Sequence, residues 1–149
     1  MKAIIQRCSE ASVTIDQNKV AEIKQGLVIL LGVGKEDNEE DIDYLVKKTI
    51  GLRIFSDENG KMNLSIQDVG GDVIIVSQFT LFAETKKGNR PSFMDSAQPD
   101  MAIPLYQTFI KHFKENFNGN VQTGQFGADM KVSLINDGPV TIIMDSKQK

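Results

Sequence analysis

Apolar and polar residues alternate with the two-residue period of a β-strand near the start of the chain. Residues 11–15 follow this alternation, and residues 2–8 are apolar with polar residues at intervals. The pattern predicts half-buried strands in both segments. Gly26 then precedes an uninterrupted apolar run, Leu27–Leu31, which is typical of a strand covered on both faces.

The segment that follows this run has the signals of an amphipathic helix. Asp37 is a candidate N-cap, and Glu40 three residues later completes the pattern of a capping box. Gly51 is expected to end the helix. The apolar side chains lie at helical spacing, at Ile42, Leu45, Val46 and Ile50. Residues 36–43 are mostly acidic; they could be a metal site, but we favour a solvated face whose charge suits the helix N-terminus.

A hairpin, a strand and a long loop are predicted next. Asn-Gly within residues 57–60 favours a tight turn between two short apolar segments. Residues 72–81 predict a strand whose buried part is Val73–Val76. Residues 85–100 are polar and contain glycine and proline, and long ordered loops of this kind are often functional.

The last third predicts a second helix and three strands. Residues 102–117 carry a helical stripe of aromatic and aliphatic residues, with Pro104 expected in the first turn. The strands are predicted at residues 121–126, 131–135 and 140–144. Together the elements predict one α+β domain over residues 1–149, with a mostly antiparallel sheet and two main helices.

Composition narrows the function classes. The 149 residues are 40% hydrophobic and 25% charged, which is ordinary for a globular protein. The N-terminus lacks the apolar stretch of a signal peptide, and the single cysteine cannot pair within the chain, so we expect a cytoplasmic protein without a membrane segment. The net charge of −3 excludes a general basic coat for nucleic acid, so any RNA must be bound by a local patch or a shaped pocket.

Most catalytic residue sets are missing. The one histidine, His112, falls at the edge of the stripe of the second helix, where we expect a boundary residue without a catalytic role. Cys8 lies in a predicted strand and is expected to be a buried structural thiol. Gly32, Gly34 and Lys35 follow a strand, but the rest of a phosphate-binding loop is absent.

Three polar segments at the ends of apolar strands are the unusual feature. They are Ser77–Leu81 (SQFTL), Gly88–Phe93 (GNRPSF) and Asn136–Thr141 (NDGPVT). Each has an ordinary structural alternative: the first could be the polar face of a strand, and the last could be a hairpin turn.

With these three segments in this order, the chain resembles the D-aminoacyl-tRNA deacylase family over essentially its whole length. The resemblance implies an α+β sandwich or barrel that works as a homodimer, with active sites at the subunit interface. It implies hydrolysis of the ester between a D-amino acid and the 3′ end of tRNA, removal of misattached glycine, and rejection of L-amino acids. No metal or organic cofactor is expected.

The resemblance also implies roles for particular residues. Ser77, Gln78, Phe79 and Thr80 would line the site of the ester. Thr80 is the family's candidate nucleophile, but this sequence offers no evident base to activate it. We therefore favour hydrolysis assisted by the 2′-hydroxyl of the terminal adenosine, with the backbone N–H groups around Phe79 and Thr80 stabilising the oxyanion.

Selectivity and RNA binding are implied for the remaining residues. Gly138 and Pro139, joined by a cis peptide bond, would exclude L-amino acids from the partner's pocket, and Arg7 would brace them. The terminal adenine would be held by Ala102, Phe126 and Met130, with Asn136 as a further substrate-binding residue. Ordinary core packing is the alternative for Phe126 and Met130. The RNA would pass near three basic residues that could equally belong to a solvated loop: Lys86, Lys87 and Arg90.

Two other functions stay open. One is a nucleic-acid-binding module of the same fold without hydrolysis, and the other is a hydrolase of free D-amino-acid esters.

Overall fold

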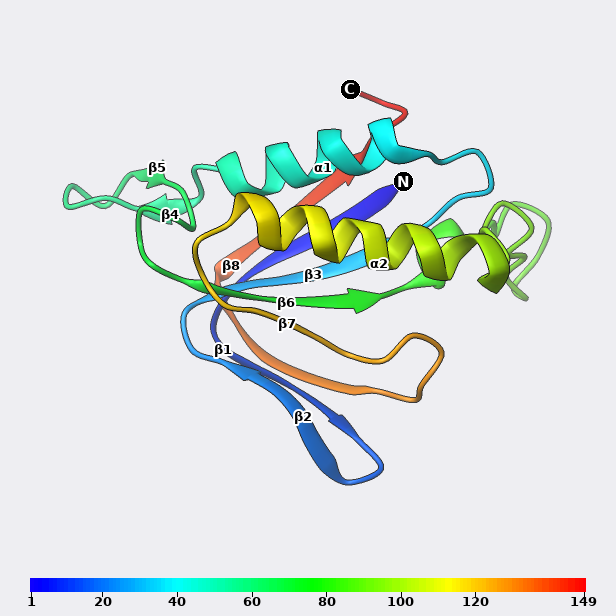
Figure 1. Cartoon of the computed structure of the whole chain (residues 1–149), viewed down its shortest axis with the longest axis horizontal. Helices are drawn as coiled ribbons and strands as arrows, with labels where there is room; N and C mark the ends of the chain where they lie inside the picture. The colour runs from blue at the N-terminus through cyan, green and yellow to red at the C-terminus, as the bar shows by residue number, and fades with distance from the viewer.

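The fold is organised around one long strand, β1 (Lys2–Ile15), that has partners along both edges. The computed structural model describes all of residues 1–149. β8 (Lys131–Asp145) pairs antiparallel with β1 along one edge (Figure 1). On the other edge, β3 (Gly26–Gly32) pairs with the first half of β1 and β2 (Asn18–Ile23) with the second half. The two segments predicted at residues 2–8 and 11–15 are therefore one continuous strand.

Two parallel strands extend the sheet beyond β3. β6 (Asp72–Ser77) pairs with β3, and β7 (Val121–Thr123) pairs with β6. The sheet order is β2-β1-β3-β6-β7, with β8 joined to β1. The sheet is thus mixed, with the mostly antiparallel pairing that the sequence predicts. A separate hairpin, β4 (Phe55–Ser56) and β5 (Met62–Leu64), confirms the turn predicted at residues 57–60.

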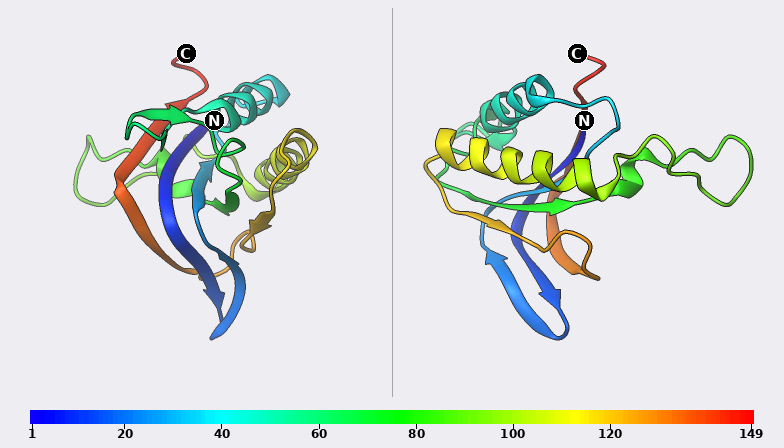
Figure 2. Two further views of the ribbon diagram at one scale, coloured as in Figure 1. Left: turned by 90° about the vertical axis from the view of Figure 1, so that its left-hand side faces the viewer. Right: turned by 45° about the vertical axis from the view of Figure 1, so that its right-hand side comes forward.

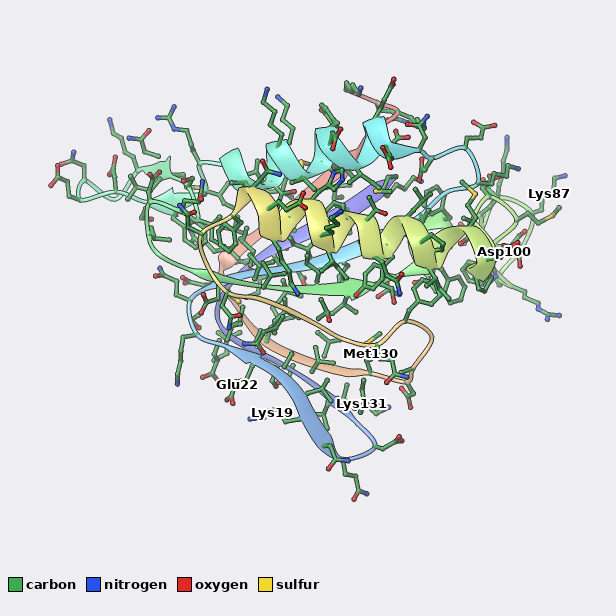
Figure 3. The ribbon with its side chains drawn as sticks, in the orientation of Figure 1. Lys19, Glu22, Lys87, Asp100, Met130 and Lys131 are labelled. Atoms are coloured by element: carbon green, nitrogen blue, oxygen red, sulfur yellow. The ribbon has the colours of Figure 1, made fainter.

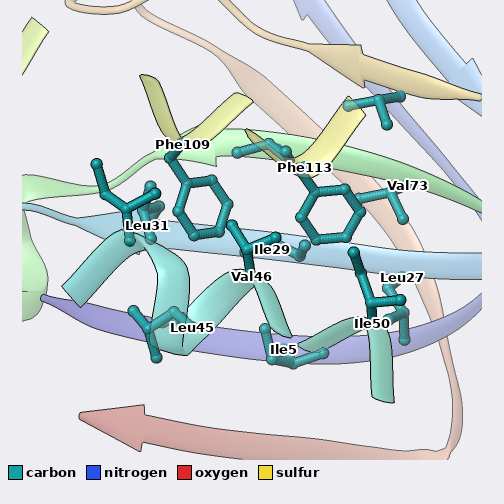
Figure 4. Close-up of a cluster of buried hydrophobic side chains, with 14 of the residues drawn as sticks. Ile5, Leu27, Ile29, Leu31, Leu45, Val46, Ile50, Val73, Phe109 and Phe113 are labelled. Atoms are coloured by element: carbon teal, nitrogen blue, oxygen red, sulfur yellow. The ribbon is translucent and has the colours of Figure 1, made fainter. Parts of the chain in front are cut away.

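Two helices cover one face of this sheet. α1 (Glu39–Gly51) and α2 (Pro99–Asn116) lie side by side over β1, β3 and β6 (Figure 1). The main core lies between the helices and the sheet, and Phe109 and Phe113 of α2 pack there against Ile29 of β3 (Figure 4). Alternate residues of β3 and β6, such as Val28 and Ile74, enter a second core on the opposite side. The apolar run of β3 is therefore covered on both faces, as predicted.

A single glutamine bridges the two ends of the curled sheet, which is nearly closed into a barrel. β2 and β7 are the two ends of the sheet order. The side-chain amide of Gln122 on β7 accepts a hydrogen bond from the Glu22 N–H and donates one to the Glu22 carbonyl, both at 2.7 Å. The amide thus takes the place of a neighbouring strand for Glu22 on β2.

The start of α1 corrects two expectations. Asn38, not Asp37, is the N-cap, and its capping-box partner is Asp41 rather than Glu40. Asp37 instead accepts hydrogen bonds from the α-amino group of Met1 and from the Gly34 N–H. Asp37 and Asp41 are buried, so the acidic run is not simply a solvated face. The acidic run correctly predicted a helix N-terminus. It did not show that the α-amino group of Met1 and the ammonium of Lys147, from the two ends of the chain, would meet there.

The loop-rich regions contain the other corrections. β6 ends at Ser77, and residues 79–82 form a 3₁₀ turn, η1 (Phe79–Phe82), instead of continuing the strand to Leu81. α2 begins at Pro99, which takes the favourable first position, so Pro104 lies inside the helix and not in its first turn.

The last two strands also differ from the sequence-based expectation. β7 ends at Thr123, before Phe126. β8 is one strand through residues 131–145, and its NDGP segment is a bulge opposite β1 instead of a turn. Neither α1 nor α2 is long and apolar enough to cross a membrane.

Methionine has a shape similar to that of glutamine but cannot make the two hydrogen bonds of the amide. Replacing Gln122 with methionine should therefore remove the bridge between β7 and β2. Two hydrogen bonds between the Gln122 side chain and the Glu22 backbone are lost at a partly exposed site, so we expect the unfolding free energy to fall by about 1–2 kcal/mol and the melting temperature by roughly 3–6 °C. Calorimetry of Gln122→Met measures this. Gln125→Met, at an exposed glutamine whose side chain makes no hydrogen bond, is the matched control. Equal melting temperatures for the two variants would contradict the closure.

The Asp41 carboxylate should make stability depend on acid pH. Burial by itself would raise its pKa, but hydrogen bonds from Lys147, Ser146 and the Asn38 N–H outweigh burial and lower the pKa from 3.8 to about 2. A carboxyl with a lowered pKa in the folded state contributes stability above its unfolded pKa and loses it as the pH falls.

The stability difference between wild type and Asp41→Asn should therefore be largest above about pH 4 and shrink towards pH 2. Urea unfolding at a series of pH values measures this difference. Asp129→Asn, at an exposed carboxylate, should show no comparable trend. A gap that stays constant from pH 6 to pH 2 would refute the role of the ionised Asp41.

Candidate active site

A cavity of about 270 Å³ lies at the end of β6, where the strand gives way to η1. Most of its lining side chains are apolar. The cavity brings together six of the residues singled out from the sequence, namely Ser77, Gln78, Phe79, Ala102, Phe126 and Met130. They come from β6, η1, the first turn of α2 and the loop between β7 and β8, so segments far apart in sequence form one pocket.

Tyr106 is a cavity residue that the sequence did not indicate. Its position in the stripe of α2 predicted only core packing. The Tyr106 hydroxyl donates a hydrogen bond to the Ile75 carbonyl at 3.1 Å, and the ring lies 5.8 Å from that of Phe126. Burial raises the pKa of the Tyr106 hydroxyl to about 12, so this group stays neutral. The two tilted rings give the cavity an aromatic lining against which a flat ligand could pack.

Met130 depends on a glycine for its place in the cavity. A methyl group at Gly124 would lie 2.3 Å from the Met130 sulfur, so a larger residue there would displace the methionine side chain from its present position. Figure 3 shows Met130 on the segment that leads into β8. The strand predicted to run to Phe126 is broken here, and the break lets Phe126 and Met130 face the cavity instead of pairing in the sheet.

The turn η1 presents unpaired backbone donors. The Gln78 N–H donates to the Leu31 carbonyl at 2.7 Å, which holds the start of the turn to β3. The N–H groups of Phe79 and Thr80 have no acceptor within the chain, as is usual for the first residues of a helical turn. The Gln78 side-chain amide bonds the Thr80 hydroxyl. No histidine, lysine or carboxylate is bonded to that hydroxyl.

The loop after η1 stands away from the body of the molecule (Figure 2). Phe93 on this loop packs edge to face on Phe79, with ring centroids 5.0 Å apart. Lys86, Lys87 and Arg90 are exposed, and none of them forms a salt bridge. Lys87 lies on the projecting loop in Figure 3.

A second group of predicted residues gathers at the bulge of β8. The Gly138–Pro139 peptide bond is cis, as the resemblance implied. Arg7, whose side chain is 11% exposed, donates from Nε to the Asp137 carbonyl at 2.8 Å and from Nη1 to the Ile54 carbonyl at 2.6 Å. The guanidinium therefore ties the bulge to the segment before β4.

Asn136 belongs to this second group and does not line the cavity. Its side chain accepts a hydrogen bond from the Val140 N–H at 2.9 Å and donates one to the Thr141 hydroxyl at 3.1 Å, across the bulge. Gly138 has a positive φ of +139°, and a methyl group there would lie 2.7 Å from the Val140 side chain. Only glycine fits this position.

The two groups lie at opposite ends of the sheet within one chain. Arg7 pairs with Leu27 at the start of β3, whereas Ser77 pairs with Leu31 at its end. Four residues of strand separate these points, or about 13 Å at ~3.3 Å per residue. In Figure 1 the bend of β8 and the end of β6 accordingly lie on opposite sides of the molecule.

The remaining candidates lie outside both groups. His112 bonds Asp43 at 2.8 Å between the two helices, which is the boundary position expected for it. Cys8 is fully buried as predicted, and burial raises the pKa of its thiol to about 11. No group of three or more histidine, cysteine or acidic side chains is arranged to hold a metal ion.

Comparison with known proteins supports the resemblance. The sequence profile of the family described as D-Tyr-tRNA(Tyr) deacylase matches residues 4–145. The D-aminoacyl-tRNA deacylases of Flavobacterium johnsoniae and Flavobacterium psychrophilum are 58% and 60% identical to this chain, over 100% of it and 99% of each relative. That of Thermosipho africanus is 56% identical over 99% of both chains.

Solved structures show the same fold. The c-Myc DNA unwinding element binding protein superposes with a TM-score of 0.93 at 37% identity, over 97% of this chain and 98% of that one. A probable eukaryotic D-amino acid tRNA deacylase superposes with a TM-score of 0.79 at 17% identity, over 96% and 97%. With a family profile that spans nearly the whole sequence and relatives of this identity, the chain belongs to the D-Tyr-tRNA(Tyr) deacylase family of hydrolases.

Proposed function

We propose that this protein hydrolyses the ester that joins a D-amino acid to the 3′ end of tRNA. One observation carries the proposal: Ser77, Gln78 and Phe79 of the SQFT segment line the cavity at the end of β6, and the free N–H groups of Phe79 and Thr80 belong to the same turn. An aminoacyl ester is already activated, so binding and stabilisation of the oxyanion can suffice for hydrolysis. The substrate would place the reaction in the cytoplasm.

The apolar part of the cavity would hold the terminal adenine. Phe126 and Tyr106 offer an aromatic wall, and Met130 and Ala102 complete the apolar lining. A cavity of about 270 Å³ has room for a nucleobase but not for a folded stretch of RNA. The adenine would anchor the 3′ end and bring the ester next to η1.

The chemistry would come from backbone donors and from the RNA itself. Thr80 has a hydroxyl bonded only to the Gln78 amide, which cannot take up a proton. The neighbouring N–H groups of Phe79 and Thr80 would stabilise the negative charge on the ester oxygen. The 2′-hydroxyl of the terminal adenosine would orient or activate the attacking water.

Rejection of L-amino acids would come from Gly138 and Pro139. Arg7 and Asn136 hold this exposed bulge on both sides, so its backbone can act as a rigid wall. A wall beside the α-carbon excludes an L side chain and leaves space for a D side chain of any size. Glycine has no side chain to exclude, so we expect glycyl-tRNA to be hydrolysed as well.

This role for the bulge requires a second copy of the chain. Within one chain the bulge and η1 lie at opposite ends of β3, so the bulge cannot reach its own cavity. We propose a homodimer in which each subunit inserts Gly138 and Pro139 into the cavity of the other. Exposed apolar side chains on β8 support such an interface: Ile135 is 53% and Ile143 76% exposed.

The projecting loop would meet the RNA ahead of the 3′ end. Lys86, Lys87 and Arg90 carry free positive charge there, on a protein whose net charge is −3. These few contacts would support weak, salt-sensitive binding. Phe93, which packs on Phe79, links this loop to the cavity.

A second candidate function is nucleic-acid binding without hydrolysis. It is favoured by the similarity, at 37% identity over nearly the whole chain, to a protein described as binding a DNA unwinding element. The hydrolysis assay separates the two functions, because a binding module would leave charged tRNA intact.

The main test compares D-tyrosyl-tRNA with L-tyrosyl-tRNA, in wild type and in Arg7→Lys. Wild type should hydrolyse the D form and spare the L form. Lysine cannot donate to both carbonyls in the geometry that Arg7 uses, so the bulge should loosen and the D over L preference fall by roughly tenfold. Arg53→Lys, which alters another arginine bonded to a backbone carbonyl, is the matched control.

The outcomes of this comparison separate the claims. Hydrolysis of neither substrate by wild type would refute the deacylase function. An unchanged preference in Arg7→Lys, with D-tyrosyl-tRNA still hydrolysed, would refute only the role of Arg7 in selectivity.

Thr80→Ala tests whether the hydroxyl is a nucleophile. Because no base is bonded to it, we expect the variant to keep substantial activity, with kcat lowered by less than about tenfold. Steady-state kinetics on D-tyrosyl-tRNA gives this value, and mass spectrometry of the quenched wild-type reaction looks for an acyl group on Thr80. An acyl-enzyme, or a loss of several orders of magnitude with binding intact, would show the RNA-assisted mechanism to be wrong.

A further inference from the structure

Phe82, the last residue of η1, packs its ring onto β3 and the segment after it, where two glycines replace side chains. A methyl group at Gly34 would lie 2.8 Å from two atoms of this ring. A methyl group at Gly32 would lie 3.2 Å from the ring and 2.9 Å from the Gln78 carbonyl oxygen. At Gly34 the ring itself therefore occupies the space that a side chain would fill. At Gly32 the closest atoms are the Gln78 carbonyl oxygen and the Leu81 Cβ, at 2.9 and 3.1 Å, and the ring comes next.

The seat of the ring is itself fixed. The Gly34 N–H donates to a carboxylate oxygen of Asp37 at 2.6 Å, and Asp37 is buried. Gly34 also forms an isolated bridge with Ser96. On β1, Lys2 pairs with Gly32 and places its ammonium 4.8 Å from the centroid of the Phe82 ring. The ring thus has a rigid backbone surface on one side and a cation–π contact as well.

This contact is the second attachment of the turn to the sheet. The first is the bond from the Gln78 N–H to the Leu31 carbonyl, before the turn starts. Between the two attachments lie Phe79 and Thr80, which are exposed and whose N–H groups are unpaired. A 3₁₀ turn has only about three residues per turn, so a shift of Phe82 passes directly to these N–H groups.

We infer that Phe82 is a positioning residue for hydrolysis, and that Gly32 and Gly34 form the seat that sets its height above β3. This inference rests on the proposed function, in which the N–H groups of Phe79 and Thr80 stabilise the oxyanion. The pattern G-x-G after the apolar strand does not form a phosphate-binding loop. In this inference its role is to let the Phe82 ring approach the backbone after β3. Phe82 does not line the cavity, so the role inferred for it is to position the turn.

A double-mutant cycle tests the inference. Gly34→Ala should push the ring away by roughly half an ångström, lowering kcat for D-tyrosyl-tRNA by roughly tenfold while KM changes by less than about twofold. Phe82→Leu removes the ring atoms that the new methyl group meets, and by itself should lower kcat to a similar extent. In the Phe82→Leu background, adding Gly34→Ala should then lower kcat by less than about twofold.

Gly51→Ala is the matched control, because a methyl group at the end of α1 meets nothing within 4 Å. It should leave kcat and KM unchanged. The D over L preference should also be unchanged in all variants, since the bulge of β8 is untouched. If Gly34→Ala does not fold, the kcat and KM of Phe82→Leu alone decide: loss of kcat with KM retained supports positioning, and unchanged kcat overturns it.

Backbone amide NMR gives a readout that does not need activity. The Phe79 and Thr80 amide signals should move in Gly34→Ala relative to wild type, and stay in place when Gly34→Ala is added to Phe82→Leu. Equal losses of kcat from Gly34→Ala in both backgrounds, or amide signals that do not move, would overturn the inference. Inactive wild-type protein would refute the proposed function, and the amide signals would then still decide whether Phe82 positions the turn.

Discussion

The structure depends on one constraint: β1 must form backbone hydrogen bonds with three other strands. β8 runs along one edge for most of its length, while β3 and β2 share the other edge. β3 leaves β1 at Cys8, and β2 joins it at Ala11. A single strand that changes partners in this way has to bend, and the bend curls the sheet until Gln122 can bridge its two ends.

The bend also creates the exposed bulge of β8. The register between β1 and β8 shifts on either side of Cys8, and the chain of β8 between Asn136 and Thr141 is not paired there. Unpaired backbone at a bend needs other partners, and the Arg7 guanidinium and the Asn136 amide supply them. The proposed selectivity element is thus a consequence of how the sheet curls. Hydrogen bonds from side chains, instead of pairing with a neighbouring strand, hold it in place.

The other half of the site follows from the burial of β6 on both faces. A strand covered by helices on one side and by the barrel core on the other can offer its functional groups only beyond its end. There the chain turns into η1, whose first N–H groups are free. The proposed catalytic groups and the proposed selectivity element therefore lie at opposite ends of β3, which is the physical ground for proposing that two copies of the chain build each site.

The sequence alone determined the elements whose pattern is local: the doubly buried run of β3, both helices, the hairpin at Asn59-Gly60, and the three polar segments that indicated the family.

It could not place the features that depend on contacts between residues far apart in the chain. The NDGP segment reads as a turn until β1 is seen to pair on both sides of it. Asp37 looks like a cap until the α-amino group of Met1 reaches it. Tyr106 looks like one more core aromatic until the break in β7 brings Phe126 beside it, and Gly32 and Gly34 look like an incomplete phosphate loop until Phe82 is found above them. In each case the deciding contact joins residues that are far apart in sequence, and periodicity along the chain carries no information about such contacts.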